Sequence, residues 1–520
     1  MTSAHQQPQS GAQLAKKVGQ SSWPAIAAVA VAGLTAQYYF TAAPAIKAAP
    51  STLEGCLNDV CAGRSDCVQF PDGNGGKELL SWARPFNLGR ASVPSAIIRP
   101  KNAQEVAGAV KCASKHNVKV QAKAGGHSYG NYGLGGQDGA VSVDLENFQY
   151  VQVDNSDPSS NVVVGGGTRL GQIDETLRSH QRAIPHGACL GVGIGGHATV
   201  GGMGQMSRMW GTTLDHVEEV EVVTADGTVA RASTRENPDL FFALRGAGAG
   251  FGIVTEFVMR THPAPQSVLH YSYNFQYSRL PDMVDLFHDW QTVAADPALD
   301  QRLGTEIVLN PLGVRVSATW YGTEAELRQS GILDRLPAGS DPVVLRQESW
   351  DGSLAHLAME EALHVPDAPG KFSSKSLGFT REDMLSRADI ADLFGWLEEQ
   401  RRTAGMWSIK FHAAGGTVSE VPAAATAYAH RDKVMFYQSH AACASGAQRG
   451  AKALVEDFHR KLLNMLPGAG GTYPGFVDPE LRDAQRSYWG DNLPALEEIK
   501  GRWDPEDVFH NPQSVVSRAS

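Results

Sequence analysis

Clusters of glycine constrain this chain more than any other feature of its sequence. Glycine accounts for 55 of the 520 residues, and four stretches are especially rich in it: KAGGHSYG from Lys123, GGG from Gly165, HGACLGVGIGGHATVGGMG from His186 and RGAGAGFG from Arg245. Glycine permits positive φ angles and lets other groups approach the backbone closely. Repeated clusters therefore indicate bare N–H groups that wrap an anionic ligand such as a pyrophosphate. Three of the clusters could converge on one extended cofactor.

One of these stretches contains the pattern Gly191-x-Gly193-x-x-Gly196, which formally matches the dinucleotide-binding fingerprint. That fingerprint needs a preceding strand and a following helix. Here a Pro/His/Gly/Cys turn precedes the pattern, and Gly201 and Gly202 soon follow it, although glycine is a poor helix former. We therefore do not expect a Rossmann fold.

The composition excludes several classes of protein. Lys and Arg total 45 against 55 Asp and Glu, which gives a net charge of −10 and no basic surface for nucleic acid. A hydrophobic content of 42% without a short repeat excludes a disordered or fibrous chain. At roughly 100–200 residues per domain, the length favours two or three domains.

The first 53 residues have the pattern of a targeting segment. They contain no Asp or Glu, and Lys16 and Lys17 precede an apolar run from Ala25 to Leu34 and then small residues. The run is shorter than the roughly 20 residues that a membrane span needs. A cleaved secretory signal, an uncleaved anchor and a disordered or organellar leader all stay open. We expect a secreted or membrane-associated protein, although the chain contains no N-x-S/T sequon.

Half of the six cysteines, Cys56, Cys61 and Cys67, are crowded into a segment with little hydrophobic periodicity. Disulfide bonds would stabilise such a segment in an oxidising compartment. No Cys-x-x-Cys pair occurs, so we expect no metal site.

Helix and strand patterns alternate through residues 85–265. An amphipathic pattern predicts a helix over Asn102–His116, and alternation predicts a strand over Val118–Ala122 that leads into the first glycine cluster. Such a mixture is typical of an α+β domain. The patterns become longer from residue 266, with a strand over Val268–Phe275 and a helix over Arg387–Arg401. We therefore predict a leader (1–53), a Cys-rich segment (54–84), a first domain (85–265), a second domain (266–465) and a loop-rich C-terminal segment (466–520).

Five strings together resemble a known family. They are KAGGHSYG, HGACLGVGIGGHATVGGMG, TLDHVEEVEVVTADG, NPDLFFALRGAGAGFGIVTEF and YWGDNLPALEEIKGRWDPEDVFHNPQS. In order and spacing they resemble the berberine-bridge-enzyme-like flavoproteins of the vanillyl-alcohol-oxidase superfamily, above all the fungal gluco- and chitooligosaccharide oxidases. The resemblance implies an α+β fold, in which a PCMH-type FAD-binding domain adjoins a substrate domain with an antiparallel sheet backed by helices. The charged C-terminal segment, including Asp504 to Asp507, is expected to fold back on the FAD domain as a solvated loop.

The resemblance also implies the cofactor site. FAD would be attached at two points, through His127 of the GGHS motif and Cys189 of the GxCxxVGxGGH motif. A small residue at Val192 is typical of oxidases, because it leaves dioxygen a path to the flavin. The further positions expected to bind FAD are Gly125, Gly126, Ser128, Gly193, Gly195, Gly196, His197, Gly201, Gly202 and Ile253. A disulfide between Cys56 and Cys112 is expected, and the other pairings stay open.

On the substrate side, Tyr129, Gln438 and Tyr473 match family positions, and the resemblance makes Tyr473 the catalytic base. A phenol titrates near ~10 in water, so it needs a partner that takes its proton or stabilises phenolate. The family aspartate that serves this purpose is absent, and its position falls on His412 or Lys410. We keep both as candidate catalytic residues.

These positions imply an oxidase that transfers a hydride from an alcohol carbon to flavin and reduces dioxygen to hydrogen peroxide. Three hypotheses stay open: a sugar C1 oxidase, an oxidase or oxidative cyclase of fungal secondary metabolism that acts on a hydrophobic substrate, and a flavin-loaded protein without turnover. The expected partners are a small-molecule substrate and dioxygen but no nucleic acid, with membrane association through the N-terminal segment. We expect a monomer.

Overall fold

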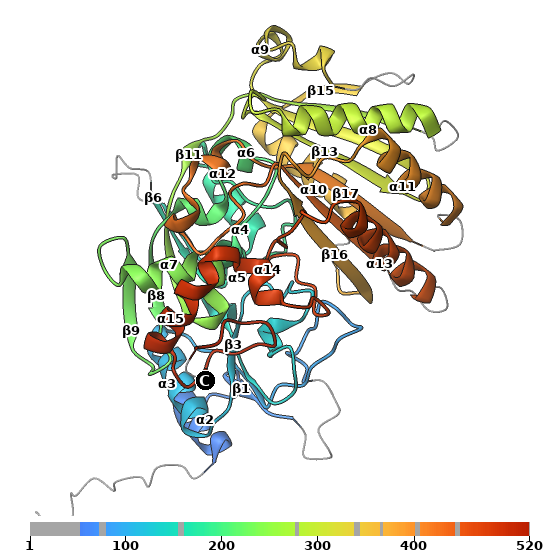
Figure 1. Ribbon diagram of the computed structural model, residues 1–520. Coiled ribbons are helices and arrows are strands. Elements are labelled where there is room, and N and C mark those ends of the chain that lie inside the picture. Colours follow the sequence, from blue (N-terminus) through green and yellow to red (C-terminus); the bar gives the residue numbers. More distant parts are fainter. Residues whose placement is uncertain are drawn as a thin grey trace, which may run out of the picture. The chain divides into compact units, whose positions relative to one another are not determined.

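Three main sheets organise the structure, a computed structural model that describes residues 52–518 apart from 72–79, 154–160, 276–279, 337–343, 364–367, 401–405 and 443–447 (Figure 1). The expected targeting segment therefore lies outside the described residues, except for its last two. None of the described helices is long and apolar enough to cross a membrane.

Two of the sheets carry the glycine clusters at the ends of their strands. The first has the order β1-β2-β4-β3, with β2 and β3 parallel to β4, and comprises β1 (Val68–Gln69), β2 (Ala96–Ile98), β3 (Val120–Lys123) and β4 (Val141–Asp144). The second is antiparallel with the order β5-β6-β10-β8-β9, and comprises β5 (Val151–Val153), β6 (Asn161–Gly165), β8 (Val217–Val223), β9 (Val229–Ser233) and β10 (Ile253–Arg260). Because clusters begin directly after β3, at the end of β6 and just before β10, the sheets fix where these loops start.

The helices of this part begin and end close to the predicted positions. The predicted helix over Asn102–His116 is confirmed as α3 (Ala103–Lys115), and the Asn102 side chain caps it by accepting a hydrogen bond from the Glu105 N–H. The remaining helices are α2 (Leu53–Cys61), α4 (Leu170–Arg178), α5 (Ile194–Val200), α6 (Ser207–Trp210) and α7 (Pro238–Ala247), beside a small ladder of β7 (Arg182–Ala183) and β11 (His262–Pro263).

Disulfides hold the N-terminal helices together. The expected Cys56–Cys112 bond is confirmed and joins α2 to α3. A second bond joins Cys61 to Cys67, a pairing that the sequence left open. The second bond lies within the segment of weak hydrophobic periodicity, and the first ties that segment to α3.

The third sheet has seven antiparallel strands in the order β15-β12-β14-β13-β17-β18-β16. Alternation places Tyr271, Ile307 and Phe411 on one apolar face, which α8 (Leu280–Ala295), α11 (Arg387–Gln400) and α13 (Gln448–Met465) cover. This is the antiparallel sheet backed by helices that the resemblance implied. Its strands are β12 (Val268–Phe275), β13 (Leu303–Asn310), β14 (Gly313–Tyr321), β15 (Val344–Glu348), β16 (Phe372–Phe379), β17 (Trp407–Ala413) and β18 (Met435–Ala442).

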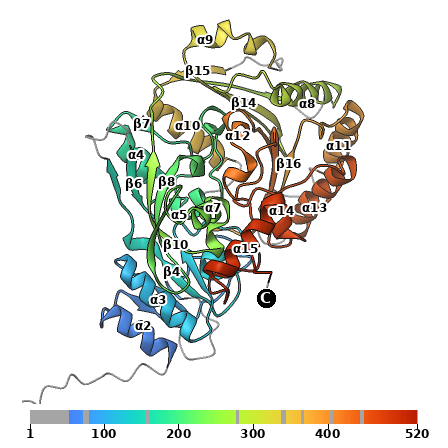
Figure 2. The same cartoon turned by 60° about the vertical axis from the view of Figure 1, so that its left-hand side comes forward.

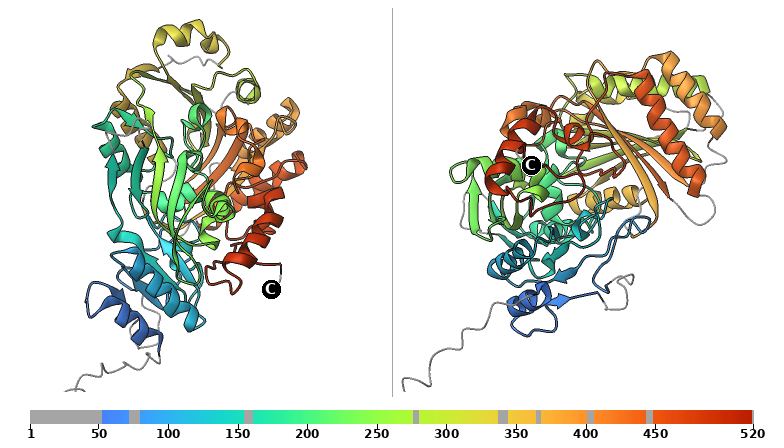
Figure 3. Two further views of the ribbon diagram at one scale, coloured as in Figure 1. Left: turned by 90° about the vertical axis from the view of Figure 1, so that its left-hand side faces the viewer. Right: turned by 60° about the horizontal axis from the view of Figure 1, so that its bottom comes forward.

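The opposite face of this sheet is polar, and α10 (Trp350–Ala362) lies across it, on the other side from α8, α11 and α13 (Figures 2 and 3). Polar contacts hold α10 in place: His270 bonds Ser353 at 3.0 Å, and Arg315 pairs with Glu360 at 2.7 Å. The polar face also meets the first part of the molecule, because Gln205 Nε2 donates to the Glu306 carboxylate at 2.9 Å. The short helices α9 (Glu324–Gln329) and α12 (Thr417–Glu420) complete this part.

The C-terminal segment returns to the first sheet, as expected. It contains α14 (Ala484–Trp489) and α15 (Leu493–Trp503), and beyond them Phe509 forms a parallel β-bridge with Val120 of β3 (Figure 1). The Trp489 indole donates to the Gly246 carbonyl at 3.0 Å. The last residues of the chain therefore contact the glycine-rich loops directly.

Candidate active site

A cavity of about 370 Å³ lies where the glycine clusters face the polar side of the seven-stranded sheet. Most of the predicted site residues line it: Gly125, Gly126, His127, Ser128, Tyr129, Cys189, Val192, Gly193, Gly195, Gly196, His197, Lys410, His412 and Tyr473. The other four predicted site residues are not among the residues that line the cavity. Gly201 and Gly202 pack against Tyr473, Gln438 contacts Tyr129, and Ile253 is fully buried in the core at the start of β10.

The glycine clusters converge because only glycine fits where they touch. A Cβ on Gly125 would lie 2.4 Å from the backbone nitrogen of Gly193, and a Cβ on Gly195 would lie 2.4 Å from the carbonyl oxygen of Gly166. Distances this short are excluded for real side chains, so any other residue would push the loops apart. Three clusters thus meet at one wall of the cavity, as the sequence suggested.

The donors on this wall suit a pyrophosphate. The N–H groups of Gly125, Gly126 and Ser128 have no acceptor within the described parts of the chain, although all three residues line the cavity. N–H groups that face a cavity need a partner, and an anion is the partner that several adjacent donors prefer. The residues present therefore fit the phosphate end of FAD.

The two expected attachment residues face the same cavity from different loops. The His127 ring stacks on Phe86, with 4.4 Å between the ring centroids. Cys189 lies in the loop between β7 and α5 and lines the same cavity. Both side chains could therefore contact one flavin.

The Tyr473 hydroxyl is held by backbone donors. Its oxygen accepts hydrogen bonds from the N–H groups of Gly202, at 2.7 Å, and Met203, at 3.2 Å. Burial raises the pKa of Tyr473 to about 12, while these two donors act to lower it. Gly201 is required beside it, because its φ is +147° and a Cβ there would lie 2.6 Å from the tyrosine ring.

Lys410 and His412, the two candidates to assist Tyr473, line the cavity together with it. Neither forms a hydrogen bond with the Tyr473 hydroxyl among the described residues. Lys410 Nζ instead donates to both oxygens of Glu361, at 2.9 and 2.7 Å, and lies 4.0 Å from Glu306. His412 is neutral, because burial lowers its pKa to about 3, and its buried Nδ1 has no hydrogen-bond partner in the described chain.

Sequence reasoning missed Glu306 and Glu361, which line the cavity beside Lys410. Glu306 is an isolated charge in the apolar strand β13, and Glu361 is one of several acids near the end of α10, so neither forms part of a recognisable motif. Strand pairing places Glu306 opposite His412, and the crossing of α10 brings Glu361 to Lys410. We call Glu306, Glu361, Lys410 and His412 the polar wall.

Gln438 and Tyr129 form a pair at the edge of this wall. Gln438 is opposite Lys410 in the β17–β18 ladder, and its Nε2 donates to the Tyr129 hydroxyl at 3.1 Å. Burial is the largest of the effects that raise the pKa of Tyr129, so its phenol stays protonated. Two of the three residues that the resemblance placed on the substrate side are therefore in contact.

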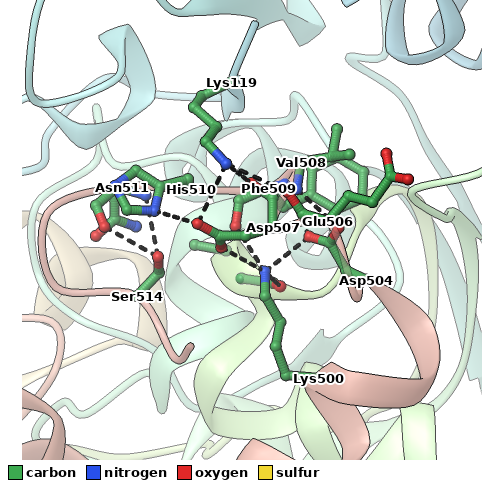
Figure 4. Close-up of polar contacts among 12 residues, drawn as sticks. Lys119, Lys500, Asp504, Glu506, Asp507, Val508, Phe509, His510, Asn511 and Ser514 are labelled. Carbon is green, nitrogen blue, oxygen red and sulfur yellow. Dashed lines mark hydrogen bonds and ion pairs between the residues drawn. The ribbon is translucent and has the colours of Figure 1, made fainter. Parts of the chain in front are cut away.

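The C-terminal segment is not the solvated loop that its charges suggested. Lys500 and Asp504 are both fully buried, and Figure 4 shows the Lys500 ammonium at the centre of a polar cluster. Lys500 Nζ donates to Asp504 Oδ2 at 2.7 Å, to the Phe509 carbonyl at 2.9 Å and to the Gly250 carbonyl at 2.8 Å. Burial is possible because each charge has a partner. Since Gly250 lines the cavity, this cluster ties the C-terminal segment to the cavity wall.

Comparisons with known proteins agree with this geometry. A family model described as an FAD binding domain matches residues 94–233, and one described as berberine and berberine like matches residues 472–516. The FAD-linked oxidoreductase sorD of Penicillium rubens is 35% identical over 473 residues, which cover 90% of this chain and 99% of that protein. The chitooligosaccharide oxidase of Gibberella zeae is 30% identical over 463 residues, covering 86% and 92%.

Solved structures give the same result. A chitooligosaccharide oxidase and the glucooligosaccharide oxidase of Acremonium strictum each superpose with a TM-score of 0.79 at 29% identity, covering 90% of this chain and 99% of theirs. The glucooligosaccharide oxidase is described with a 6-S-cysteinyl, 8α-N1-histidyl FAD.

Proposed function

This chain belongs to the berberine-bridge-enzyme-like family of FAD-linked oxidoreductases, and on that premise we propose that it oxidises an alcohol carbon of a small molecule with dioxygen as the acceptor. When bound, FAD would accept the hydride and pass the electrons to dioxygen, giving hydrogen peroxide. The protein has to hold the cofactor, orient the substrate and remove the hydroxyl proton.

One observation carries this proposal: Tyr473 lines the same cavity as His127 and Cys189, and its hydroxyl oxygen accepts hydrogen bonds from two backbone N–H groups. Fixed donors at 2.7 and 3.2 Å stabilise negative charge on that oxygen without having to reorganise. We therefore assign the role of base to Tyr473, which has to lose its own proton before it can take that of the substrate, because burial raises its pKa to about 12 despite these donors. The N–H groups of Gly202 and Met203 would stabilise phenolate, one of the two tasks for which Lys410 and His412 were candidates.

We further propose that FAD is attached covalently at both His127 and Cys189. The support is that both side chains line one cavity and that a relative of the same fold carries a cysteinyl and histidyl FAD. Two attachment points would fix the position of the ring relative to Tyr473. The small Val192 side chain, which also lines the cavity, supports access of dioxygen.

For the substrate we favour a hydroxylated molecule of the sugar type. The polar wall places the carboxylates of Glu306 and Glu361 in the cavity, where they can accept hydrogen bonds from hydroxyl groups. These two carboxylates supply acceptors for substrate hydroxyl groups although the family aspartate is absent. A second candidate is a hydrophobic metabolite, which the 35% identity to sorD keeps open, because that name specifies no sugar.

The proposal is tested with purified, flavin-loaded protein. After acid denaturation, yellow flavin should stay with the polypeptide, and the native enzyme should release peroxide with members of a panel of oligosaccharides, simple alcohols and apolar polyketide alcohols. Tyr473→Phe should keep its flavin and lose about 100-fold or more in the rate of peroxide release.

The matched control is Tyr428→Phe, which alters a neighbouring buried phenol whose hydroxyl contacts the Met203 sulfur at 3.5 Å. It should keep most of the activity. Full activity of Tyr473→Phe would contradict the role of the base, and release of flavin on denaturation would contradict covalent attachment. A loaded flavin that no compound reduces would support the hypothesis of a protein without turnover.

A further inference from the structure

The loop that presents Cys189 is held at both ends by α4. It runs from His186 to Gly193, and α4 (Leu170–Arg178) lies beside it. The first turn of α4 holds the far end, where the Leu170 N–H donates to the Val192 carbonyl at 2.9 Å and the Gly171 N–H donates to the Leu190 carbonyl at 3.1 Å. One turn further along, Asp174 holds the near end.

Asp174 acts on the near end through His186. The His186 side chain is buried, with Nε2 at 2.7 Å from Asp174 Oδ1 and Nδ1 at 2.8 Å from the Gly187 carbonyl oxygen. Both of these partners can only accept, so both ring nitrogens must donate, and the ring is an imidazolium. Burial alone would lower the pKa of His186, but the charge and hydrogen bond of Asp174 outweigh it and raise that pKa.

A second histidine fixes the same peptide. The Gly187 N–H donates to His197 Nε2 at 3.1 Å, which requires that this nitrogen carries no proton. Burial meets this requirement, because it lowers the pKa of His197 to about 3. The backbone of Gly187 is therefore held at its carbonyl by the charged His186 and at its N–H by the neutral His197. Cys189 follows two residues later.

We propose that Asp174 is a positioning residue, which acts through His186 to hold Cys189 where its sulfur can bond to FAD. This inference rests on the attachment proposed above. In that attachment the Cys189 S–H and one ring C–H bond are lost and a sulfur–carbon bond forms. The two electrons and two protons released reduce dioxygen to hydrogen peroxide, so no other oxidant is needed.

Different loops and different partners hold the two attachment residues, Cys189 and His127. Asp174 and His186 hold the Cys189 loop, whereas His127 lies in the KAGGHSYG loop after β3 and stacks on Phe86. Loss of the Asp174 carboxylate should therefore weaken attachment at Cys189 and leave attachment at His127 intact. A general loss of stability would affect both.

The test is Asp174→Ala in the full chain, followed by digestion and mass spectrometry of the peptides that contain Cys189 and His127. We expect the fraction of Cys189 that carries flavin to fall about tenfold, as is common when a supporting carboxylate is removed. The His127 peptide should stay modified. Asp174→Asn keeps an oxygen that can accept from His186, so it should restore part of the Cys189 linkage.

Asp351→Ala is the matched control. Asp351 lies on α10, and the change removes its exposed ion pair with Arg178, at 3.9 Å, at the end of α4. It should leave both linkages as in the parent. Full modification of Cys189 in Asp174→Ala would overturn the inference, and so would an equal loss at both residues. If Asp174→Ala does not fold, as judged by circular dichroism, the partial loss expected in Asp174→Asn decides. A parent protein with flavin on His127 alone would refute attachment at Cys189 and leave the proposed oxidation standing.

Discussion

Lys410 keeps its charge inside the cavity wall because carboxylates surround it. Burial alone would lower the pKa of this ammonium, but Glu361 and Glu306 outweigh that effect and hold the pKa above its ordinary value. Burial in turn raises the pKa of Glu306, which Lys410 opposes. The charge of each of these side chains depends on the charges of the others, so a substitution of one changes the pKa values of the rest.

Lys410→Met should therefore destabilise the protein. The change leaves the Glu361 and Glu306 carboxyl groups without their cation, and breaking a buried pair in this way costs about 3 kcal/mol. Denaturant unfolding measures the loss, and a second change, Glu361→Gln, in the same chain should recover part of it. Lys461→Met, which removes an exposed pair with Asp392, is the control and should change the free energy of unfolding by less than about 0.5 kcal/mol. Equal stability of Lys410→Met and the parent would refute this account.

Single residues also show where sequence reasoning reaches its limit. The position of Tyr473 in the cavity could be predicted, because the resemblance places a tyrosine at this point of the C-terminal segment. The partners of its hydroxyl could not, since Gly202 and Met203 lie about 270 residues earlier in the chain. Glu306 and Glu361 were missed for the same reason: tertiary packing alone gives them their neighbours.

Periodic elements were predicted more accurately than the contacts between them. The strand over Val268–Phe275 is found with these bounds, and the helix predicted over Arg387–Arg401 is α11, described to Gln400, because periodicity is a local property of the chain. One local argument was wrong. The glycines after Gly196 were expected to prevent a helix, but α5 begins at Ile194, within the motif, and ends just before Gly201. Glycine terminates that helix and does not exclude it.

The two disulfides should differ in what they contribute to stability. Cys56–Cys112 closes a loop with a sequence separation of 56, and Cys61–Cys67 closes one of only 6. A longer loop loses more entropy in the unfolded chain when it is closed, so replacing the Cys56–Cys112 pair by serine should cost about 4 kcal/mol. The same change at Cys61–Cys67 should cost less. Denaturant midpoints of the two double variants check the order, and the reverse order would contradict it.

Across the whole molecule, buried histidines tie stability to pH. Burial lowers the pKa of eight described histidines to about 3 or about 4: His197, His216, His262, His270, His412, His430, His440 and His459. In the unfolded chain each would take up a proton near pH ~6.5. The unfolded state therefore binds more protons than the folded state between these values. His186 acts in the opposite sense, but it is a single group.

The free energy of unfolding should accordingly fall as the pH drops from 7 to 5. The contribution of these histidines is fully present above pH ~6.5 and is lost as the pH falls toward their folded values, with a total loss on the order of a few kcal/mol or more by pH 5. Denaturant midpoints at pH 7, 6 and 5 measure it. The slope of the denaturant dependence serves as the control, because it should stay constant if only protonation changes. A midpoint that is the same at pH 5 and pH 7 would contradict this prediction.

The Lys500 cluster also dictates an order of events during synthesis. Asn511, Gln513 and Ser514 line the cavity, and Lys500 holds the Gly250 carbonyl only when Asp504 and Phe509 are in place. A ribosome makes Lys500 250 residues after Gly250, so the glycine-rich loops are synthesised long before the residues that close their pocket. A stop codon directly after Val508 would remove Phe509 and these three residues, and with them one wall of the pocket.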